Sequence, residues 1–111
     1  MIQNKEEYII CSAVWYQELE LKGDLESYSY LPKNLDKGIV FCGHRHGQCI
    51  YTKCAITGLR DGESGPHIQG FLTSKNRFVD RVEALEIALR NDQVLDISDV
   101  RGNKLHSEDI Y

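Results

Sequence analysis

The stretch from Gly70 to Arg90, GFLTSKNRFVDRVEALEIALR, limits the possible folds more than any other part of this sequence. Its second half predicts a helix, because Asp80 is a good N-cap and Glu83 follows three residues later, as in a capping box. The apolar residues expected to face the core are Val82, Leu85 and Ala88 or Leu89. The residues expected to face solvent are Arg81, Glu83 and Arg90, and Asn91-Asp92 is expected to end the helix.

Strands and one further helix are predicted before this element. EYIICSAVWYQ is rich in β-branched and aromatic residues and predicts a strand over Tyr8–Tyr16. KGIVFCG, an apolar run between glycines, is typical of a buried strand. HGQCIYTKCAITG has apolar residues at helical spacing and Gly58 as a C-cap, although its β-branched residues leave a strand open. IQGFLTS predicts another strand, and KNRF the turn that leaves it.

The remaining segments are expected to be less regular. Leu19–Pro32 predicts either a hairpin return or an irregular sheet edge, and LRDGESGPH predicts a loop. QVLDISD is expected to add a last short strand, and NKLHSEDIY to form a polar tail in which Glu108 and Asp109 are solvated. Together these patterns predict one α+β domain over residues 1–111, a small antiparallel sheet packed with two helices.

Length and charge restrict the class of protein. At 111 residues the chain has the size of a single domain, and its net charge of −4 argues against binding to DNA or RNA polymers. No apolar run approaches the ~20 residues of a membrane-spanning helix. The start, MIQNKEEYII, lacks the apolar core of a signal peptide, so we expect a cytosolic chain with reduced cysteines.

The segment CGHRHGQC, Cys42 to Cys49, is the first candidate for chemistry. It contains four zinc-ligand side chains, but structural zinc sites usually draw pairs of ligands from two places separated by a longer loop. A turn with buried cysteines and surface histidines is the plainer interpretation. Arg45, between His44 and His46, would alternatively form an anion fork, strengthened by the amides of a helix starting just after the turn. A cysteine–histidine nucleophile pair is a further alternative.

The second candidate is the region from Phe71 to Arg81. Phe71 and Phe78 have flat faces that can stack on a base, and Arg77 can reach a phosphate. Short hydrogen-bonding groups suited to a ribose or a base edge come from Thr73, Ser74 and Asn76. The free amides of the following helix could face the same anion. The structural alternative is that both phenylalanines belong to the core.

Four segments carry a resemblance to a known family: YIICSAVWY, LPKNLDKGIVFCGHRHGQC, QGFLTSKNRFVDRVEALEIALRNDQ and SEDIY. In order and spacing the chain resembles the first-described Thoeris anti-defense family of small phage and prophage proteins. The resemblance spans nearly the whole chain and is most specific at Gly43–Cys49 and Gly70–Ala84. The turn differs from the Gly-Arg-Arg-His-His expected of the family at positions 44 and 47. The family fold is a small antiparallel sheet with two helices, assembled as homodimers or higher homo-oligomers with ligand pockets at subunit contacts.

This resemblance implies a protein that is not an enzyme. It would bind and sequester cyclic ADP-ribose isomers, made by bacterial TIR-domain enzymes, in the host cytoplasm. Family members are also associated with cyclic di- and trinucleotides at separate sites, and whether this chain has such a site is open. No catalytic residue, metal or cofactor is implied. The residues onto which the ligand-binding role is carried are His44, Arg45, His46, Phe71, Thr73, Ser74, Lys75, Asn76, Arg77, Phe78 and Arg81.

In the implied mechanism a phenylalanine stacks on adenine, while Arg45, Arg77 and Lys75 hold the pyrophosphate. Two other functions remain open from the residues alone. One is a small enzyme that cleaves a cyclic nucleotide signal with His44, His46 and a thiol or metal. The other is a protein–protein inhibitor that presents the aromatic loop as its contact surface.

Overall fold

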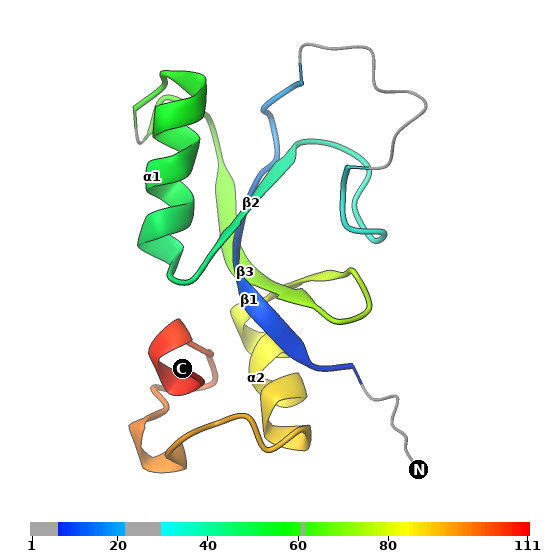
Figure 1. Cartoon of the computed structure of the whole chain (residues 1–111), viewed down its shortest axis with the longest axis vertical. Coiled ribbons are helices and arrows are strands. Elements are labelled where there is room, and N and C mark those ends of the chain that lie inside the picture. The colour runs from blue at the N-terminus through cyan, green and yellow to red at the C-terminus, as the bar shows by residue number, and fades with distance from the viewer. Residues whose placement is uncertain (1–6, 22–29, 61) are drawn as a thin grey trace.

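Four antiparallel strands form one sheet in the computed structural model, which describes residues 7–21, 30–60 and 62–111 (Figure 1). The strand order is β2-β1-β3-β4. The strands are β1 (Ile9–Tyr16), β2 (Ile39–Gly43), β3 (His67–Thr73) and β4 (Phe78–Asp80). The helices are α1 (His46–Thr57) and α2 (Arg81–Arg90), and short 3-10 helices follow at Ile97–Asp99 and Ser107–Asp109. The predicted α+β fold, an antiparallel sheet with two helices in a single domain, is confirmed.

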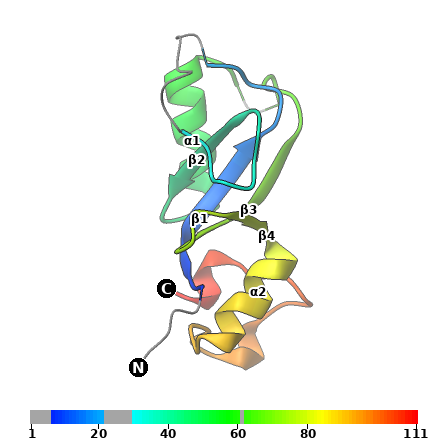
Figure 2. The ribbon, with the colours of Figure 1, turned by 90° about the vertical axis from the view of Figure 1, so that its right-hand side faces the viewer.

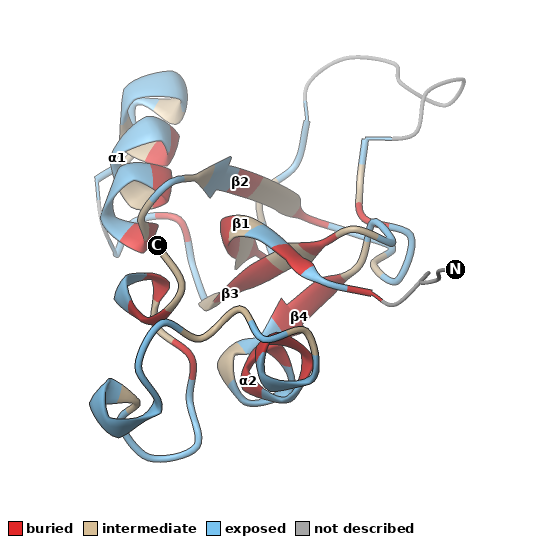
Figure 3. Ribbon diagram, turned by 60° about the horizontal axis from the view of Figure 1, so that its bottom comes forward, coloured by how far each residue is buried: buried red, intermediate tan, exposed pale blue. Residues whose placement is uncertain are grey.

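Both helices pack on the same face of the sheet. Val14 of β1 lies opposite Phe41 of β2, and both pack with Cys49 of α1. On the same face, Phe71 of β3 and Val79 of β4 pack against the buried residues of α2, which are Ala84, Leu85, Ile87 and Ala88. Figure 3 shows these buried positions along the strands and the inner side of α2.

The opposite face of the sheet is covered by the segment from Tyr30 to Gly38. Figure 2 shows this cyan segment crossing the sheet in front while α1 lies behind. Asn34 fixes it to β4, since its side chain exchanges hydrogen bonds of 2.7 and 2.9 Å with the backbone of Phe78. The Phe78 ring fits because Gly70 has no side chain, and a Cβ there would lie 2.9 Å from the ring and 2.0 Å from the Val79 oxygen.

The caps of both helices lie where the sequence predicts them. The Asp80 carboxylate accepts a hydrogen bond from the backbone amide of Glu83 at 2.9 Å. Gly58 ends α1 in the left-handed conformation, with φ of 75°, and its amide donates to the Cys54 oxygen. The helix alternative for this segment is therefore the correct one, and the strand alternative is wrong.

The face that α2 turns to the core matches the predicted one at Leu85 and Ala88, which are buried, and differs from it at other positions. Val82 and Leu89 are 38% and 45% exposed, whereas Arg81, expected outside, is half-buried. The Arg81 guanidinium donates to Gln69 Oε1 at 2.7 Å and to the Leu105 oxygen at 2.8 Å. These two acceptors rotate the start of the helix toward the sheet, so that Ala84 and Ile87 become core residues in place of Val82 and Leu89.

The strand predicted over QVLDISD does not form. The Gln93 side chain instead pairs with β1, since it accepts from the Ile9 amide and donates to the Ile9 oxygen, both at 2.9 Å. A side-chain amide thus takes the backbone groups that a neighbouring strand would have used. The prediction of a buried strand at KGIVFCG is correct only in part, because β2 is an edge strand with Cys42 exposed.

The C-terminal residues are part of the core rather than a polar tail. Leu105 is fully buried, and Ser107 and Asp109 are nearly so. The Asp109 carboxylate accepts from the His106 amide at 2.8 Å, which corrects the expectation that it is solvated. The prediction for Leu19–Pro32 falls largely on residues 22–29, outside the described residues. In the described part of the chain, neither helix has the length and hydrophobicity needed to cross a bilayer.

Candidate anion-binding site

The turn between β3 and β4 is held by an ion-pair network. Arg77 donates to both carboxylate oxygens of Glu7, at 2.7 and 2.9 Å, and to Glu83 at 2.8 Å. The Thr73 hydroxyl adds a hydrogen bond of 2.6 Å to the same Glu7 carboxylate. The Arg77 hydrogen bonds lower the pKa of Glu7 to about 2. Arg77, proposed from the sequence as a phosphate ligand, is therefore engaged within the fold.

The neighbouring residues of this turn also serve the fold. Phe71 is fully buried, with the His46 ring edge-on to it at 4.9 Å, and Phe78 is 6% exposed against Trp15. Ser74 accepts from the Tyr8 amide at 2.9 Å, and Asn76 takes a left-handed turn conformation with φ of 58°. Neither phenylalanine presents a free face for stacking in this structure. Lys75 is exposed at the tip of the turn.

A different set of residues meets at a cavity of about 400 Å³ beside the first turn of α1. Figure 1 shows the C-terminal segment, in red, lying between this end of α1 and α2. The residues that line the cavity are Arg45, His46, Gly47, Arg81, His106, Ser107 and Glu108. The structure thus joins three of the residues expected to bind ligand, from two predicted regions, and adds four that the sequence did not suggest.

Arg45 is positioned by the C-terminal segment. Its Nη1 donates to Ser107 Oγ and its Nη2 to the backbone oxygen of Tyr111, each at 3.0 Å. Its guanidinium also lies 5.4 Å from the centre of the Tyr111 ring. With the Ser107 hydroxyl and the Tyr111 main-chain oxygen as acceptors, Arg45 is a fixed cationic group at the wall of the cavity.

Arg81 supplies a second guanidinium at the same cavity. Within the described residues, its guanidinium bonds to neutral oxygens of Gln69 and Leu105. Burial lowers the pKa of Arg81, yet an arginine remains protonated at neutral pH. The single carboxylate lining the cavity is that of Glu108, which is exposed. The cavity therefore combines two cationic side chains with one acidic side chain.

Two imidazoles complete the polar wall. His46 Nε2 lies 2.7 Å from the Gly70 oxygen, which fixes Nε2 as the protonated nitrogen that donates. Burial lowers the pKa of His46, so the ring is neutral at pH 7. Burial also lowers the pKa of His106, whose buried Nδ1 has no hydrogen-bond partner among the described residues. Its nearest acidic atom, Asp109 Oδ2, is 3.8 Å away.

The first turn of α1 adds backbone donors. The helix has no side-chain cap, because the residue at the N-cap is Arg45. Its carbonyl accepts from the amides of Gln48 and Cys49, at 3.0 and 3.2 Å. Within the described residues, the amides of His46 and Gly47 have no hydrogen-bond partner. Uncapped amides and the helix dipole favour an anion at this position.

His44 lies beside the cavity rather than in it. Its ring stacks on that of Tyr111, with centres 4.6 Å apart and planes 20° from parallel. The Tyr111 hydroxyl in turn accepts from the Ser12 amide at 3.0 Å. This pair gives the site a flat aromatic surface next to the Arg45 guanidinium.

The zinc and cysteine–histidine alternatives are not assembled in this structure. Cys49 Sγ is buried and donates to the Ser12 oxygen at 3.6 Å, whereas Cys42 is exposed on β2. His44 and His46 are engaged separately, with Tyr111 and Gly70. Among the described residues, no three histidine, cysteine or acidic side chains converge in a way that could hold a metal ion.

Sequence reasoning missed His106, Ser107 and Tyr111 because they were assigned to a polar tail. The signal that could have placed them is Leu105, an apolar residue inside that tail, since a lone leucine flanked by polar residues often anchors a segment to a core. Gly47 was missed because a glycine early in a helix is ordinarily unfavourable. Here a Cβ would meet nothing within 4 Å, so glycine leaves the cavity open next to the free amides.

Comparison with known proteins identifies the family. The family model described as phage T4 y16D protein matches residues 8–111, which covers all the strands, both helices and every residue that lines the cavity. No curated protein and no solved structure matches the chain significantly. The chain therefore belongs to the phage T4 y16D protein family, a family of phage proteins.

Proposed function

We propose that this phage protein binds and sequesters a cyclic ADP-ribose isomer in the cytoplasm of the host bacterium, without degrading it. The observation that carries the proposal is the pairing of Arg45 and Arg81 with two unpaired backbone amides around one cavity. Charge-assisted hydrogen bonds and a helix N-terminus are the groups that proteins use to hold phosphate oxygens. The resemblance to the Thoeris anti-defense family supports the identity of the ligand.

The dimensions of the site support a nucleotide-sized ligand. The cavity of about 400 Å³ falls within the range of about 300–1,000 Å³ typical of small-molecule sites. The pyrophosphate would lie between Arg45, Arg81 and the amides of His46 and Gly47. His46 Nδ1 and His106 would address hydroxyl groups of a ribose, since neutral imidazoles both donate and accept.

The adenine ring needs an aromatic partner, and the stacked His44–Tyr111 pair lies closest to the cations. This assignment replaces Phe71 and Phe78, whose rings are buried in the fold. A second subunit would cover the open side of the cavity and exclude water, in keeping with the expected homo-oligomer. Sequestration needs a dissociation constant of roughly 1 nM, about −12 kcal/mol. Several charge-assisted bonds in an enclosed site can supply this.

Calorimetry with cyclic ADP-ribose isomers tests the proposal, with cyclic di- and trinucleotides as comparison ligands. We expect saturable binding of a cyclic ADP-ribose isomer by the wild-type protein. Arg45→Ala and Arg81→Ala should each weaken it by about 10–150-fold, the loss of one hydrogen-bonded charge worth about 1.5–3 kcal/mol. Arg90→Ala removes the same charge from an exposed position on α2 and should leave the affinity unchanged.

Release of the ligand separates capture from catalysis. The complex is denatured after long incubation, and the freed ligand is analysed by mass spectrometry. Recovery of intact ligand supports sequestration, whereas a cleaved product would show that the protein is an enzyme. Equal binding by wild type, Arg45→Ala and Arg81→Ala, with all three folded, would place the ligand elsewhere. Failure of every cyclic nucleotide to bind would favour a protein–protein inhibitor.

A further inference from the structure

Two cysteines lie together on the face of the sheet that the helices leave free. Cys42 of β2 is opposite Ala13 of β1, so Cys11, two residues before Ala13, is its diagonal neighbour on the same face. The contact with the Cys42 side chain lowers the pKa of Cys11 to about 7. The same contact raises the pKa of Cys42. The contact therefore favours ionisation of Cys11 over ionisation of Cys42.

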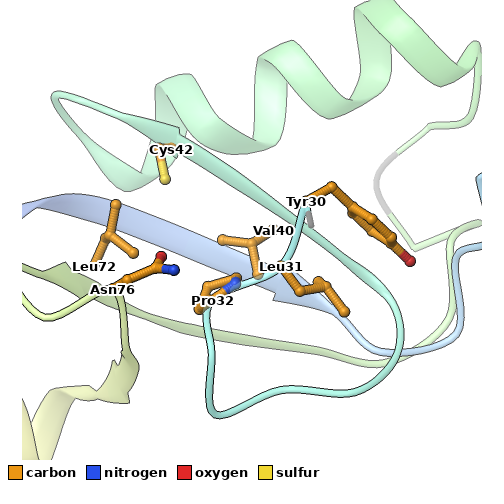
Figure 4. Close-up of a pocket in the computed structure, with 7 residues that line it drawn as sticks. All are labelled: Tyr30, Leu31, Pro32, Val40, Cys42, Leu72 and Asn76. Atoms are coloured by element: carbon orange, nitrogen blue, oxygen red, sulfur yellow. The ribbon is translucent and has the colours of Figure 1, made fainter. Parts of the chain in front are cut away.

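A pocket gives small molecules access to Cys42. Figure 4 shows Cys42 directed toward Leu72 and Asn76, with Val40 next to it along β2 and Pro32 on the facing segment. The pocket has a volume of about 180 Å³, and Cys42 itself is exposed. Cys11 is half-buried beside it.

The other two cysteines, Cys49 and Cys54, differ from Cys11 and Cys42 in their neighbours and in their accessibility. Cys49 is fully buried on the helix-covered face, donates to the Ser12 oxygen and has its pKa raised to about 11 by burial. Cys54 lies on α1, partly exposed. All four cysteines are free thiols. The chain therefore carries one pair on the face away from the helices and two other thiols, Cys49 on the opposite face and Cys54 on α1, that serve as internal references.

We propose that Cys11 and Cys42 form a dithiol modification site, which low-molecular-weight disulfides such as oxidised glutathione convert to a disulfide between β1 and β2. The Cys11 thiolate attacks one sulfur of the reagent, forms a mixed disulfide and releases one reduced thiol. Cys42 then loses its proton and attacks the Cys11 sulfur, which displaces the second reduced thiol. The protein loses two protons and two electrons, and the reagent gains both.

The sheet can accommodate this bond. A disulfide needs Cβ atoms about 3.5–4.5 Å apart, closer than the usual diagonal separation on a sheet. Bridging the pair therefore requires β2 to move toward Cys11. Within the described residues β2 is an edge strand that pairs with β1, so this movement breaks no ladder with another strand. The register of β1 also shifts between Ile9 and Cys11, where it pairs with β3. The backbone is thus irregular immediately beside Cys11.

Incubation of the full chain with oxidised glutathione tests the proposal. Free thiols are counted after denaturation, and proteolytic peptides are mapped by mass spectrometry. We expect the count to fall from four to two, with Cys11 joined to Cys42 and no glutathione retained. Cys42→Ser should keep a glutathione adduct at Cys11, because the resolving thiol is missing. Cys54→Ser, the matched control, should form the same cross-link as wild type.

Three results would overturn the proposal. They are retention of all four thiols, a stable adduct on Cys42 of the wild-type protein without a cross-link, and cross-links that involve Cys49 or Cys54 instead. The site lies on the face opposite the anion cavity, and the assay contains no nucleotide. Its outcome is therefore independent of the proposed function.

Discussion

The two helices of this protein begin in opposite ways. α2 starts after Asp80, whose carboxylate bonds to the Glu83 amide and supplies the negative charge that a helix N-terminus favours. α1 starts after Arg45, which offers no side-chain acceptor and leaves the amides of His46 and Gly47 unpaired. In both helices the amide of the third residue is bonded within the chain, but the acceptor in α2 is the charged Asp80 carboxylate and in α1 the neutral Arg45 carbonyl. Only α1 begins beside a cavity with two arginines and no capping carboxylate among the described residues.

This difference is the basis for the proposed position of an external anion. An anion at α2 would have to compete with the Asp80 carboxylate, whereas at α1 it would meet free amides and positive side chains. Sequence reasoning placed anion-binding amides at the start of both helices. The chemistry of the N-cap residue separates them, and variants that exchange or remove these features test the comparison.

The largest effect is expected when α1 is given the kind of cap that α2 has. Arg45→Asp would place a carboxylate at the N-cap, where it can accept from the amide of Gln48. It would also replace attraction for the ligand with repulsion. We expect cyclic ADP-ribose affinity to fall by about 1,000-fold, close to 4 kcal/mol, measured by calorimetry.

Arg45→Ala is the control, since it removes the cation without adding a cap. It should lose less affinity than Arg45→Asp. Equal losses in the two variants would mean that the helix end contributes nothing. Thermal unfolding of both variants shows whether the fold is retained.

The next largest effect is a loss of stability, expected when Arg77 is removed from its ion pair with Glu7. Arg77→Ala would leave the largely buried Glu7 carboxylate without its cationic partner, so unfolding free energy should fall by about 3 kcal/mol. Denaturant unfolding measures this. Lys75→Ala, a charge change at the exposed tip of the same turn, should change stability by less than about 0.5 kcal/mol. An Arg77→Ala protein that is fully stable but fails to bind ligand would contradict this assignment.

Acid should destabilise the fold through the ion pair between Glu7 and Arg77. Arg77 lowers the pKa of Glu7 from 4.5 to about 2 in the folded state, so below about pH 5 the unfolded chain binds this proton more readily. The stabilisation is present above pH 4.5 and is lost progressively as the pH falls toward 2. Glu7→Gln should flatten the dependence of stability on pH in this window, measured by urea unfolding. An unchanged slope would show that other carboxyl groups dominate.

A smaller change is expected from uncapping α2. Asp80→Ala removes the acceptor for the Glu83 amide and should cost about 1 kcal/mol of stability. Ligand affinity should stay at the wild-type value, because the cap lies outside the cavity lining. A loss of affinity comparable to that of Arg45→Ala would erase the distinction between the two helix ends.

The smallest effect is expected at Gly47. A Cβ there meets nothing within 4 Å, and alanine is favoured over glycine in a helix, so Gly47→Ala should stabilise the fold by about 0.5–1 kcal/mol. The added methyl would occupy space beside the free amides, so ligand affinity should fall. A variant that gains stability and binds as tightly as wild type would place the ligand away from this turn.

Local chemistry made much of the fold predictable. Asp80 and Gly58 determine where α2 begins and α1 ends, and each acts on backbone groups within four residues. The inward face of α2 was not predictable in this way, because Arg81 turns it by reaching Gln69 and Leu105, which are distant in sequence. The strand expected at QVLDISD failed for the same reason, since Gln93 pairs with Ile9.

The candidate site was predictable only in part. Arg45 and His46 are found because a short motif brings them together, and the helix after them was expected. Their convergence with Arg81 and His106 depends on how the C-terminal segment packs, which periodicity does not reveal. The Phe71–Phe78 stretch was predicted to bind a ligand. Its aromatic, hydroxyl and cationic residues are equally well suited to packing in the fold and to a buried ion-pair network.

The packing of the C-terminal segment also means that the candidate site is completed late in synthesis of the chain. Arg45 and Arg81 emerge from the ribosome before Ser107 and Tyr111, which hold Arg45 in place. A nascent chain that has been translated through α2 already contains both arginines. It still lacks Ser107 and Tyr111, which hold the Arg45 guanidinium in place. Under the proposed function, capture would begin only after Ser107 and Tyr111 have been translated, and a chain terminated before them would hold Arg45 less firmly.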